Sequence, residues 1–163
     1  MKQNENNIII LELIPCMRMF IIENWPMLIF YGVIVYLLSV DDMTVKLAAA
    51  GAVVLFSSML LYRFIYLSRM KWIVTRLQIR SEHGVFTRDI QYLELYRVVD
   101  YSEKQSFLQM LTGIKDVIVY SGDRTTPALR IMGIPASMEV IPILKQLVEE
   151  QKKIHNIYEI TNR

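Results

Sequence analysis

Two long apolar runs dominate the first half of the chain. No charged residue occurs from Asn24 to Val40, and a second run extends from Leu47 to Leu67 with Arg63 as its one charged residue. The acidic pair Asp41-Asp42 lies between them. Each run approaches the ~20 residues that an α-helix needs to cross the hydrocarbon core of a bilayer. The pattern therefore predicts a two-helix transmembrane hairpin over residues 24–69.

The charges that flank the hairpin predict its orientation. Basic residues without an intervening acid follow the second run, and they are Arg69, Lys71, Arg76 and Arg80. The connection between the runs has two aspartates and one lysine, Lys46. Positive residues remain on the cytoplasmic side, so we expect both termini in the cytoplasm. Arg63 lies close enough to the membrane end to extend to the headgroups, and Trp25 and Trp72 are expected at the same interface.

Residues 1–23 are expected to form a cytoplasmic or interfacial segment. Ile8–Leu13 is compatible with a strand or with a segment that lies at the membrane surface. Met17–Ile22, which follows Pro15, is expected to lie along the headgroups before the chain enters the membrane. The single cysteine, Cys16, excludes an internal disulfide. We interpret it as an apolar packing residue, with palmitoylation as the alternative.

From Lys71 onward the apolar residues follow the spacing of β-strands. Lys71–Arg80 alternates, with Arg76 and Arg80 on the same face as Trp72, which predicts one half-buried strand. A turn is expected over Ser81–Gly84, where Gly84 is free to adopt a positive φ angle. Further strands are predicted over Val85–Leu95, Tyr96–Gln105, Ile114–Tyr120 and Ala128–Ile134.

Two helical segments accompany these strands. Phe107, Met110 and Leu111 have helical spacing and precede Gly113, which predicts a single helical turn that ends at the glycine. Nearer the C-terminus, apolar residues recur at helical spacing over residues 140–148, with Ser137 as a candidate N-cap. We therefore expect one domain over residues 70–153 and a tail over residues 154–163.

The order and spacing of these elements resemble the bacterial pleckstrin-homology-like (PH-like) domain proteins. The resemblance rests on GVFTRDIQYLELYRVVDYSEKQSFLQMLTGIKDVIVYSGD, followed by PALRIMGIP and a helix, and it extends over about residues 15–153. It implies an α+β fold of the membrane-anchored type: two N-terminal transmembrane helices, then a PH-like antiparallel β-sandwich or partly open barrel capped by a C-terminal helix. In such a fold the helical turn Phe107–Leu111 would insert its apolar side chains into a corner of the sandwich. The resemblance also places the protein in the bacterial cytoplasmic membrane.

Few residues suggest catalysis or metal binding. His83 and His155 are far apart and belong to no metal-binding spacing. Ser57 and Ser58 lie in the second apolar run, with no histidine or lysine at membrane depth to activate them. A net charge of +2 is too small to indicate nucleic acid binding. We expect no enzymatic activity, cofactor, metal or nucleic acid.

One set of cationic residues is a candidate site for a lipid headgroup or a protein partner. Its members are Arg76, Arg80, His83 and Arg88. By the resemblance, PH domains that bind inositol phosphates place cations on comparable early strands and their loop, and arginine suits phosphate. Glu82 and Asp89 interleave with these residues, which favours an ordinary solvated surface.

These features predict a noncatalytic, membrane-anchored interaction module that scaffolds or regulates a membrane protein complex. Its expected partners are bilayer lipid, which surrounds the hairpin, and a protein; a second copy of the chain is a further candidate. One alternative is a sensor of anionic lipid headgroups. Another is an accessory subunit of a membrane enzyme or transporter.

Overall fold

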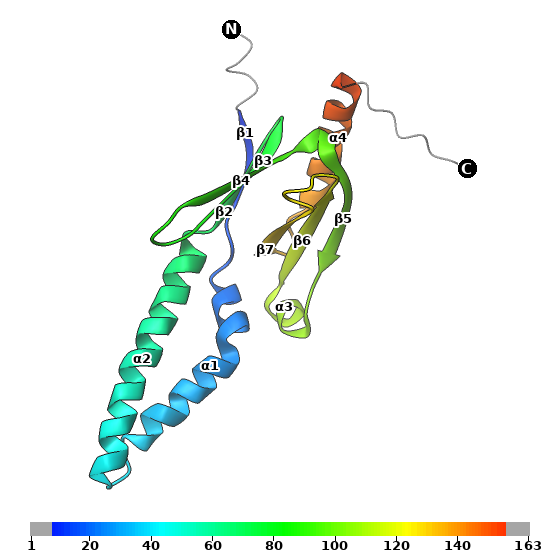
Figure 1. The fold of residues 1–163 in the computed structure, drawn as a ribbon. Coiled ribbons are helices and arrows are strands. Elements are labelled where there is room, and N and C mark those ends of the chain that lie inside the picture. The colour runs from blue at the N-terminus through cyan, green and yellow to red at the C-terminus, as the bar shows by residue number, and fades with distance from the viewer. Residues whose placement is uncertain (1–7, 156–163) are drawn as a thin grey trace.

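The computed structural model describes residues 8–155, which form a helical hairpin and a β-sandwich (Figure 1). Helices α1 (Arg18–Leu37) and α2 (Met43–Ser68) lie side by side. Asp42 caps α2, because its carboxylate accepts a hydrogen bond from the backbone N–H of Thr44 at 2.8 Å. By length and composition both helices could cross a membrane, and only 11% and 6% of their apolar windows are buried. They are therefore not the core helices of the sandwich.

Helix α1 begins at Arg18 and continues without a break into the apolar run. The first helix of the hairpin therefore begins six residues before the predicted boundary at Asn24 and includes most of the segment Met17–Ile22. Met19 packs with Leu67 of α2 and Ile114 of the sandwich, and Cys16 lies against the same cluster. This packing explains why the helix starts early, because its first turn buries apolar surface between the hairpin and the sandwich.

The sandwich consists of two antiparallel sheets. The first has the order β1 (Ile9–Leu13), β2 (Lys71–Thr75), β3 (Gln78–His83) and β4 (Asp89–Glu94). The second has the order β5 (Val98–Lys104), β6 (Ile114–Ser121) and β7 (Ala128–Pro135). A 3₁₀ turn, η1 (Leu95–Arg97), joins β4 to β5. Alternate residues of both sheets point inward and form the core.

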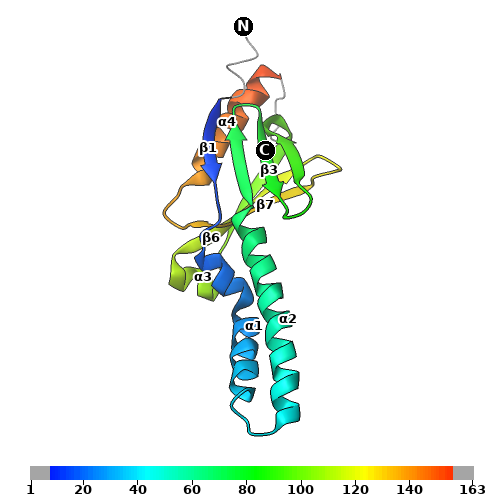
Figure 2. The same cartoon turned by 90° about the vertical axis from the view of Figure 1, so that its left-hand side faces the viewer.

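Helix α4 (Val140–Ile154) closes this core with an apolar face that includes Leu144 and Leu147 (Figure 2). Its N-cap is Glu139 rather than the predicted Ser137, which leaves Pro142 in the first turn, where a missing N–H costs nothing. The predicted tail falls mostly outside the described residues.

The single strand predicted over Lys71–Arg80 is wrong, because the structure divides it into β2 and β3. A tight turn at Arg76-Leu77 joins them, and Thr75 Oγ1 donates to the Gln78 carbonyl at 3.0 Å. Val74 pairs with Ile79, so both point into the core although their numbers differ in parity. A continuous alternation could not reveal this reversal. The following loop also lies later than predicted, over residues 84–88, and Gly84 has the expected positive φ, +119°.

Strand β1 precedes the hairpin in sequence but belongs to the first sheet, where Leu13 pairs with Trp72. The sandwich therefore includes a strand from outside residues 70–153, and the strand interpretation of Ile8–Leu13 is confirmed. Trp72 is buried in the core, so its predicted position at the membrane interface is wrong. Helix α2 ends at Ser68, and β2 begins at Lys71. Because successive side chains of a strand point to opposite faces, Trp72 then points into the core.

Helix α3 (Phe107–Thr112) ends at Gly113, which has the expected left-handed conformation with φ +68°. The prediction that its apolar residues fill a corner of the sandwich is wrong. Phe107, Met110 and Leu111 are 74%, 58% and 76% exposed, whereas Gln109 is only 4% exposed. The buried Asp116 in β6 accepts a hydrogen bond from Gln109 at 2.9 Å, which turns the polar side of α3 inward.

Candidate functional site

The end of the first sheet that adjoins α2 contains most of the candidate residues. Strand β2 leaves α2 at Lys71 and runs away from the hairpin, and β3 returns to place Glu82 opposite Lys71. The loop of residues 84–88 therefore lies beside the end of α2 (Figure 1). Arg76 lies at the opposite end of the β2–β3 hairpin, ~15 Å from Lys71 at the usual rise per residue. The structure thus brings Arg80, His83 and Arg88 together and separates Arg76 from them.

Glu82 organises the cations at this end. Its carboxylate lies 2.6 Å from Arg80 Nη2, 2.5 Å from Arg88 Nη2 and 3.8 Å from Lys71 Nζ. Glu82 is only 4% exposed. Burial on its own raises the pKa of this carboxyl, but the hydrogen bond from Arg88 and the charges of Arg80 and Lys71 outweigh it, so the pKa of Glu82 lies below its ordinary value. Arg80 and Arg88 therefore serve first as partners of a buried carboxylate.

Aromatic contacts join α2 to the 84–88 loop and to His83, the last residue of β3. Phe86 stacks on Tyr62 with ring centroids 6.1 Å apart, although 91% of its surface is exposed. His83 meets Tyr66 edge-on at 6.4 Å, and its Nε2 lies 3.1 Å from Asp89 Oδ2. These contacts hold the membrane-proximal loop of the sheet against the last turns of the helix.

A cavity of about 410 Å³ opens between this loop and the end of α2. Ser68, Arg69, Lys71 and Glu82 line it together with residues 83–88. Its cations outnumber its one carboxylate, so it favours an anion. Sequence reasoning used Arg69 and Lys71 for orientation but missed them as lining residues. Their convergence depends on the pairing of Lys71 with Glu82, which no local pattern reveals.

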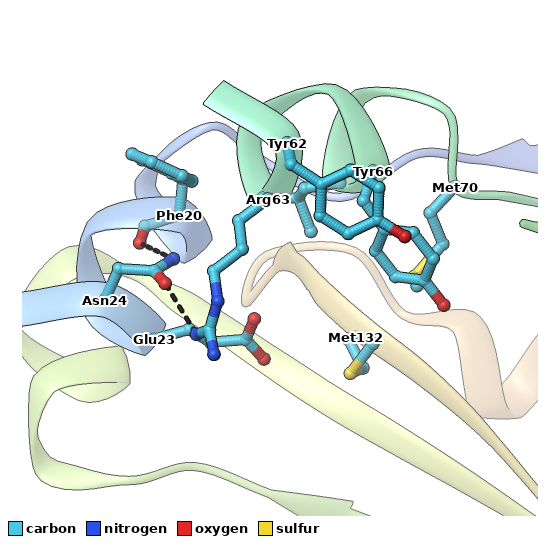
Figure 3. Close-up of a pocket in the computed structure, with 9 residues that line it drawn as sticks. Phe20, Glu23, Asn24, Tyr62, Arg63, Tyr66, Met70 and Met132 are labelled. Carbon is cyan, nitrogen blue, oxygen red and sulfur yellow. Dashed lines mark hydrogen bonds between the residues drawn. The ribbon is translucent and has the colours of Figure 1, made fainter. Parts of the chain in front are cut away.

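A second cavity, of about 350 Å³, lies where the hairpin meets the sandwich (Figure 3). Asn24 of α1 is buried there, accepts a hydrogen bond from Arg63 Nη1 at 2.8 Å and donates one to the Phe20 carbonyl at 2.8 Å. Glu23 of α1 and Met132 of β7 line the same cavity (Figure 3). Arg63 thus ties α2 to α1, a partner that the sequence did not indicate.

A comparison with models of known protein families identifies the family to which this fold belongs. The model of the family described as "Bacterial PH domain" matches residues 27–148. The chain belongs to this family. The resemblance inferred from the sequence is thereby confirmed, and so is the PH-like fold. No curated protein and no solved structure gives a significant match.

The family match begins inside α1 and ends inside α4, so most of the hairpin and most of the sandwich belong to the matched region of this PH domain protein. PH-like domains are generally noncatalytic, and their sites bind rather than react. Among residues 8–155, no group of three or more His, Cys, Asp or Glu side chains could hold a metal ion. Within the described residues, Arg69 and Lys71 present positive charge at the cavity beside α2, and large apolar side chains are exposed along the hairpin.

Proposed function

We propose that this protein is a noncatalytic interaction module that α1 and α2 anchor in the bacterial cytoplasmic membrane. The hairpin supports the anchoring, because large apolar side chains such as Ile29, Val54 and Leu55 are exposed along its length. An apolar surface of this extent is unfavourable in water and is typical of contact with lipid. The basic residues after α2 favour a cytoplasmic sandwich, which would then stand at the membrane surface.

The proposal that the partner is a protein rests on β1, which forms an edge of the first sheet. Strand β1 lies at one end of the first sheet and pairs, within the described part of the chain, with β2. Ile9 and Ile10 are exposed along it, and so is Ile8, which directly precedes it. An edge strand with exposed apolar side chains can accept an extended segment as an additional strand, through main-chain hydrogen bonds and side-chain contacts. We therefore assign β1 as the docking edge for an extended segment of a membrane complex.

Site-specific photo-crosslinking in native membranes tests this function. A photo-reactive residue at Ile10 should form a protein adduct, and the charged substitution Ile9→Lys should abolish it because a lysine on an edge strand opposes strand addition. The matched control is Val99, an exposed apolar residue of the other sheet. Adducts of equal yield at both positions, or none at Ile10, would overturn the docking edge. An adduct with a second copy would identify a homo-oligomer.

The orientation has a separate test. Single cysteines at Met43, the first residue of α2, and at Lys153, near the end of α4, should react differently with a membrane-impermeant reagent in intact cells. We expect labelling at residue 43 and protection at residue 153. The reverse pattern would place the sandwich outside the cytoplasm.

A second candidate function is the recognition of an anionic lipid headgroup in the Ser68–Arg88 cavity. Arg69 favours it, because this residue lines the cavity and makes no ion pair within residues 8–155. If the function is correct, the solubilised full-length protein should bind glycerophosphate in a salt-dependent way. Arg69→Gln should weaken binding about fivefold, since a cation near an anionic surface contributes ~1 kcal/mol. Arg76→Gln is the matched control, and equal effects of both substitutions would exclude this site.

A further inference from the structure

Helix α3 has its polar and apolar sides in the reverse of the usual order for a helix on a water-soluble domain. Gln109 faces the protein, whereas Phe107, Met110 and Leu111 face away from it. A surface helix ordinarily buries its apolar side and solvates its polar side. The arrangement of α3 is favourable where the medium outside the protein is itself apolar.

Hydrogen bonds fix this reversed orientation. Gln109 Oε1 accepts from the Ser106 backbone N–H at 2.8 Å, and the Gln109 backbone N–H donates to Ser106 Oγ at 3.3 Å, which completes a capping box. Gln109 Nε2 donates to the buried Asp116 carboxylate at 2.9 Å. The capping box fixes the Gln109 side chain within α3, and rotating α3 to bury its apolar side would break the Gln109–Asp116 hydrogen bond and leave Asp116 without one of its donors. The outward direction of Phe107, Met110 and Leu111 is therefore built into the domain.

The position of α3 places these residues beside the hairpin. Both ribbon views show α3 next to the first turns of α1 (Figures 1 and 2). Arg18 Nη1 donates to the Thr112 carbonyl at 2.8 Å. Leu108 shares an apolar cavity of about 290 Å³ with Ile21 and Trp25 of α1. The outer side of α3 therefore continues the apolar surface of the hairpin at the level of Trp25.

The other helix of the hairpin also carries an exposed apolar contact. Phe86, in the loop between β3 and β4, stacks on Tyr62 of α2. Tyr62 is adjacent in sequence to Arg63, which binds Asn24, and Asn24 is adjacent to Trp25. The Arg63–Asn24 hydrogen bond thus ties the helix segments that carry the two contacts to each other. Phe86 and the outer side of α3 are both exposed apolar surface where the sandwich meets the hairpin.

We propose that α3 is a membrane-inserted element, whose Phe107, Met110 and Leu111 enter the boundary between lipid headgroups and acyl chains. This inference rests on the proposed anchoring of α1 and α2. The occupant of this surface is lipid rather than protein, because the surface is continuous with the hairpin and lies at the depth where aromatic residues and the ends of apolar helices meet the headgroups. Insertion would hold the sandwich in one orientation, with α3 and Phe86 toward the bilayer.

Spin-label accessibility in the full-length protein tests the proposal. In a Cys16→Ser background, nitroxides are attached at residues 110, 99 and 54, and the protein is reconstituted into phosphatidylethanolamine–phosphatidylglycerol vesicles. Collisions with oxygen, which concentrates in the bilayer, are compared with collisions with a water-soluble nickel chelate. We expect oxygen to dominate at residues 110 and 54 and nickel to dominate at residue 99, which is exposed at the other end of β5 from α3.

The other outcomes would each refute one claim: the insertion of α3, lipid as its partner, or the anchoring of the hairpin. Nickel dominance at residue 110, with oxygen dominance at residue 54, would refute insertion of α3 and leave the anchoring intact. Protection of residue 110 from both reagents would replace lipid by a second copy of the chain. Nickel dominance at residue 54 would refute the anchoring itself. As a further check, Leu111→Glu should reduce the oxygen signal at residue 110 without changing the urea unfolding midpoint; a large fall in the midpoint would show that α3 packs inside the protein.

Discussion

Asp116 is the residue whose substitution tests most directly how the parts of the domain are joined. Its carboxylate is buried in β6 and receives hydrogen bonds from two other elements, α3 and β7. Oδ1 accepts from Gln109 Nε2 of α3 at 2.9 Å and from the Gly133 backbone N–H of β7 at 2.8 Å. Oδ2 accepts from Arg130 Nη2 at 2.6 Å and from Nε at 3.2 Å. Gly133 in turn accepts from the Cys16 N–H just before α1.

The two oxygens are expected to contribute unequally. Asp116→Ala leaves the Gln109 amide and the Gly133 N–H buried without an acceptor, which costs ~1–3 kcal/mol for each donor. The expected loss is therefore ~2–6 kcal/mol, against a typical total stability of ~5–15 kcal/mol. Arg130 is 55% exposed at its side chain and can turn to water, so its ion pair contributes no more than ~1 kcal/mol. Asp116→Asn retains an acceptor at the Oδ1 position and should therefore be much milder than Asp116→Ala.

Urea unfolding in a nonionic detergent measures the difference. In a Trp25→Phe background the buried Trp72 is the one remaining tryptophan and reports on the sandwich core. Asp116→Ala should lower the midpoint by ~1–3 M at an ordinary m-value. Asp116→Asn and the control Arg130→Gln should shift it only slightly. If the Asn variant were as unstable as the Ala variant, the charge and not the acceptor would matter; if the Ala variant were unaffected, the network would contribute nothing.

Three further substitutions have defined outcomes. Gly84→Ala should disorder the 84–88 loop and cost ~1–3 kcal/mol, because φ is +119° and the new Cβ would clash with the backbone carbonyl oxygen of Thr87 in the same loop. Gly133→Ala should separate α1 from β7 at a similar cost, since its Cβ would lie 2.9 Å from the Met19 side chain. In the control Gly122→Ala the new Cβ meets no atom within 4 Å, so this substitution should be neutral. Urea unfolding midpoints check these three glycine variants. Burial raises the pKa of Tyr101 to about 12. Since the unfolded pKa is ~10, the stability contributed by the neutral hydroxyl is complete below about pH 10 and is lost as the pH rises to about 12, and Tyr101→Phe should abolish this loss in midpoints measured across that range.

The sequence alone determined the parts of this protein that depend on local physical limits. Two apolar runs that approach membrane length, with Arg63 as their one charged residue, can form few structures other than apolar helices, because no domain of this size could bury both. The positive φ angles of Gly84 and Gly113 were predicted for the same kind of reason, since glycine reaches this conformation without a steric cost. The strands from β4 to β7 and the C-terminal helix followed from changes in apolar spacing, and their order was enough to indicate the family.

The tertiary structure decided which way the side chains face and which of them meet. Periodicity shows that positions share a face, but it does not say whether that face is the core, the solvent or lipid. Trp72 was therefore expected at the membrane and lies in the core, while the apolar side of α3 was expected in the core and lies outside. Contacts between separate elements decide which side of an element is buried and which polar groups meet. Examples are Gln109 with Asp116, Arg63 with Asn24, and Lys71 with Glu82. They arise between residues of separate elements, and only the folded arrangement of the chain brings them together.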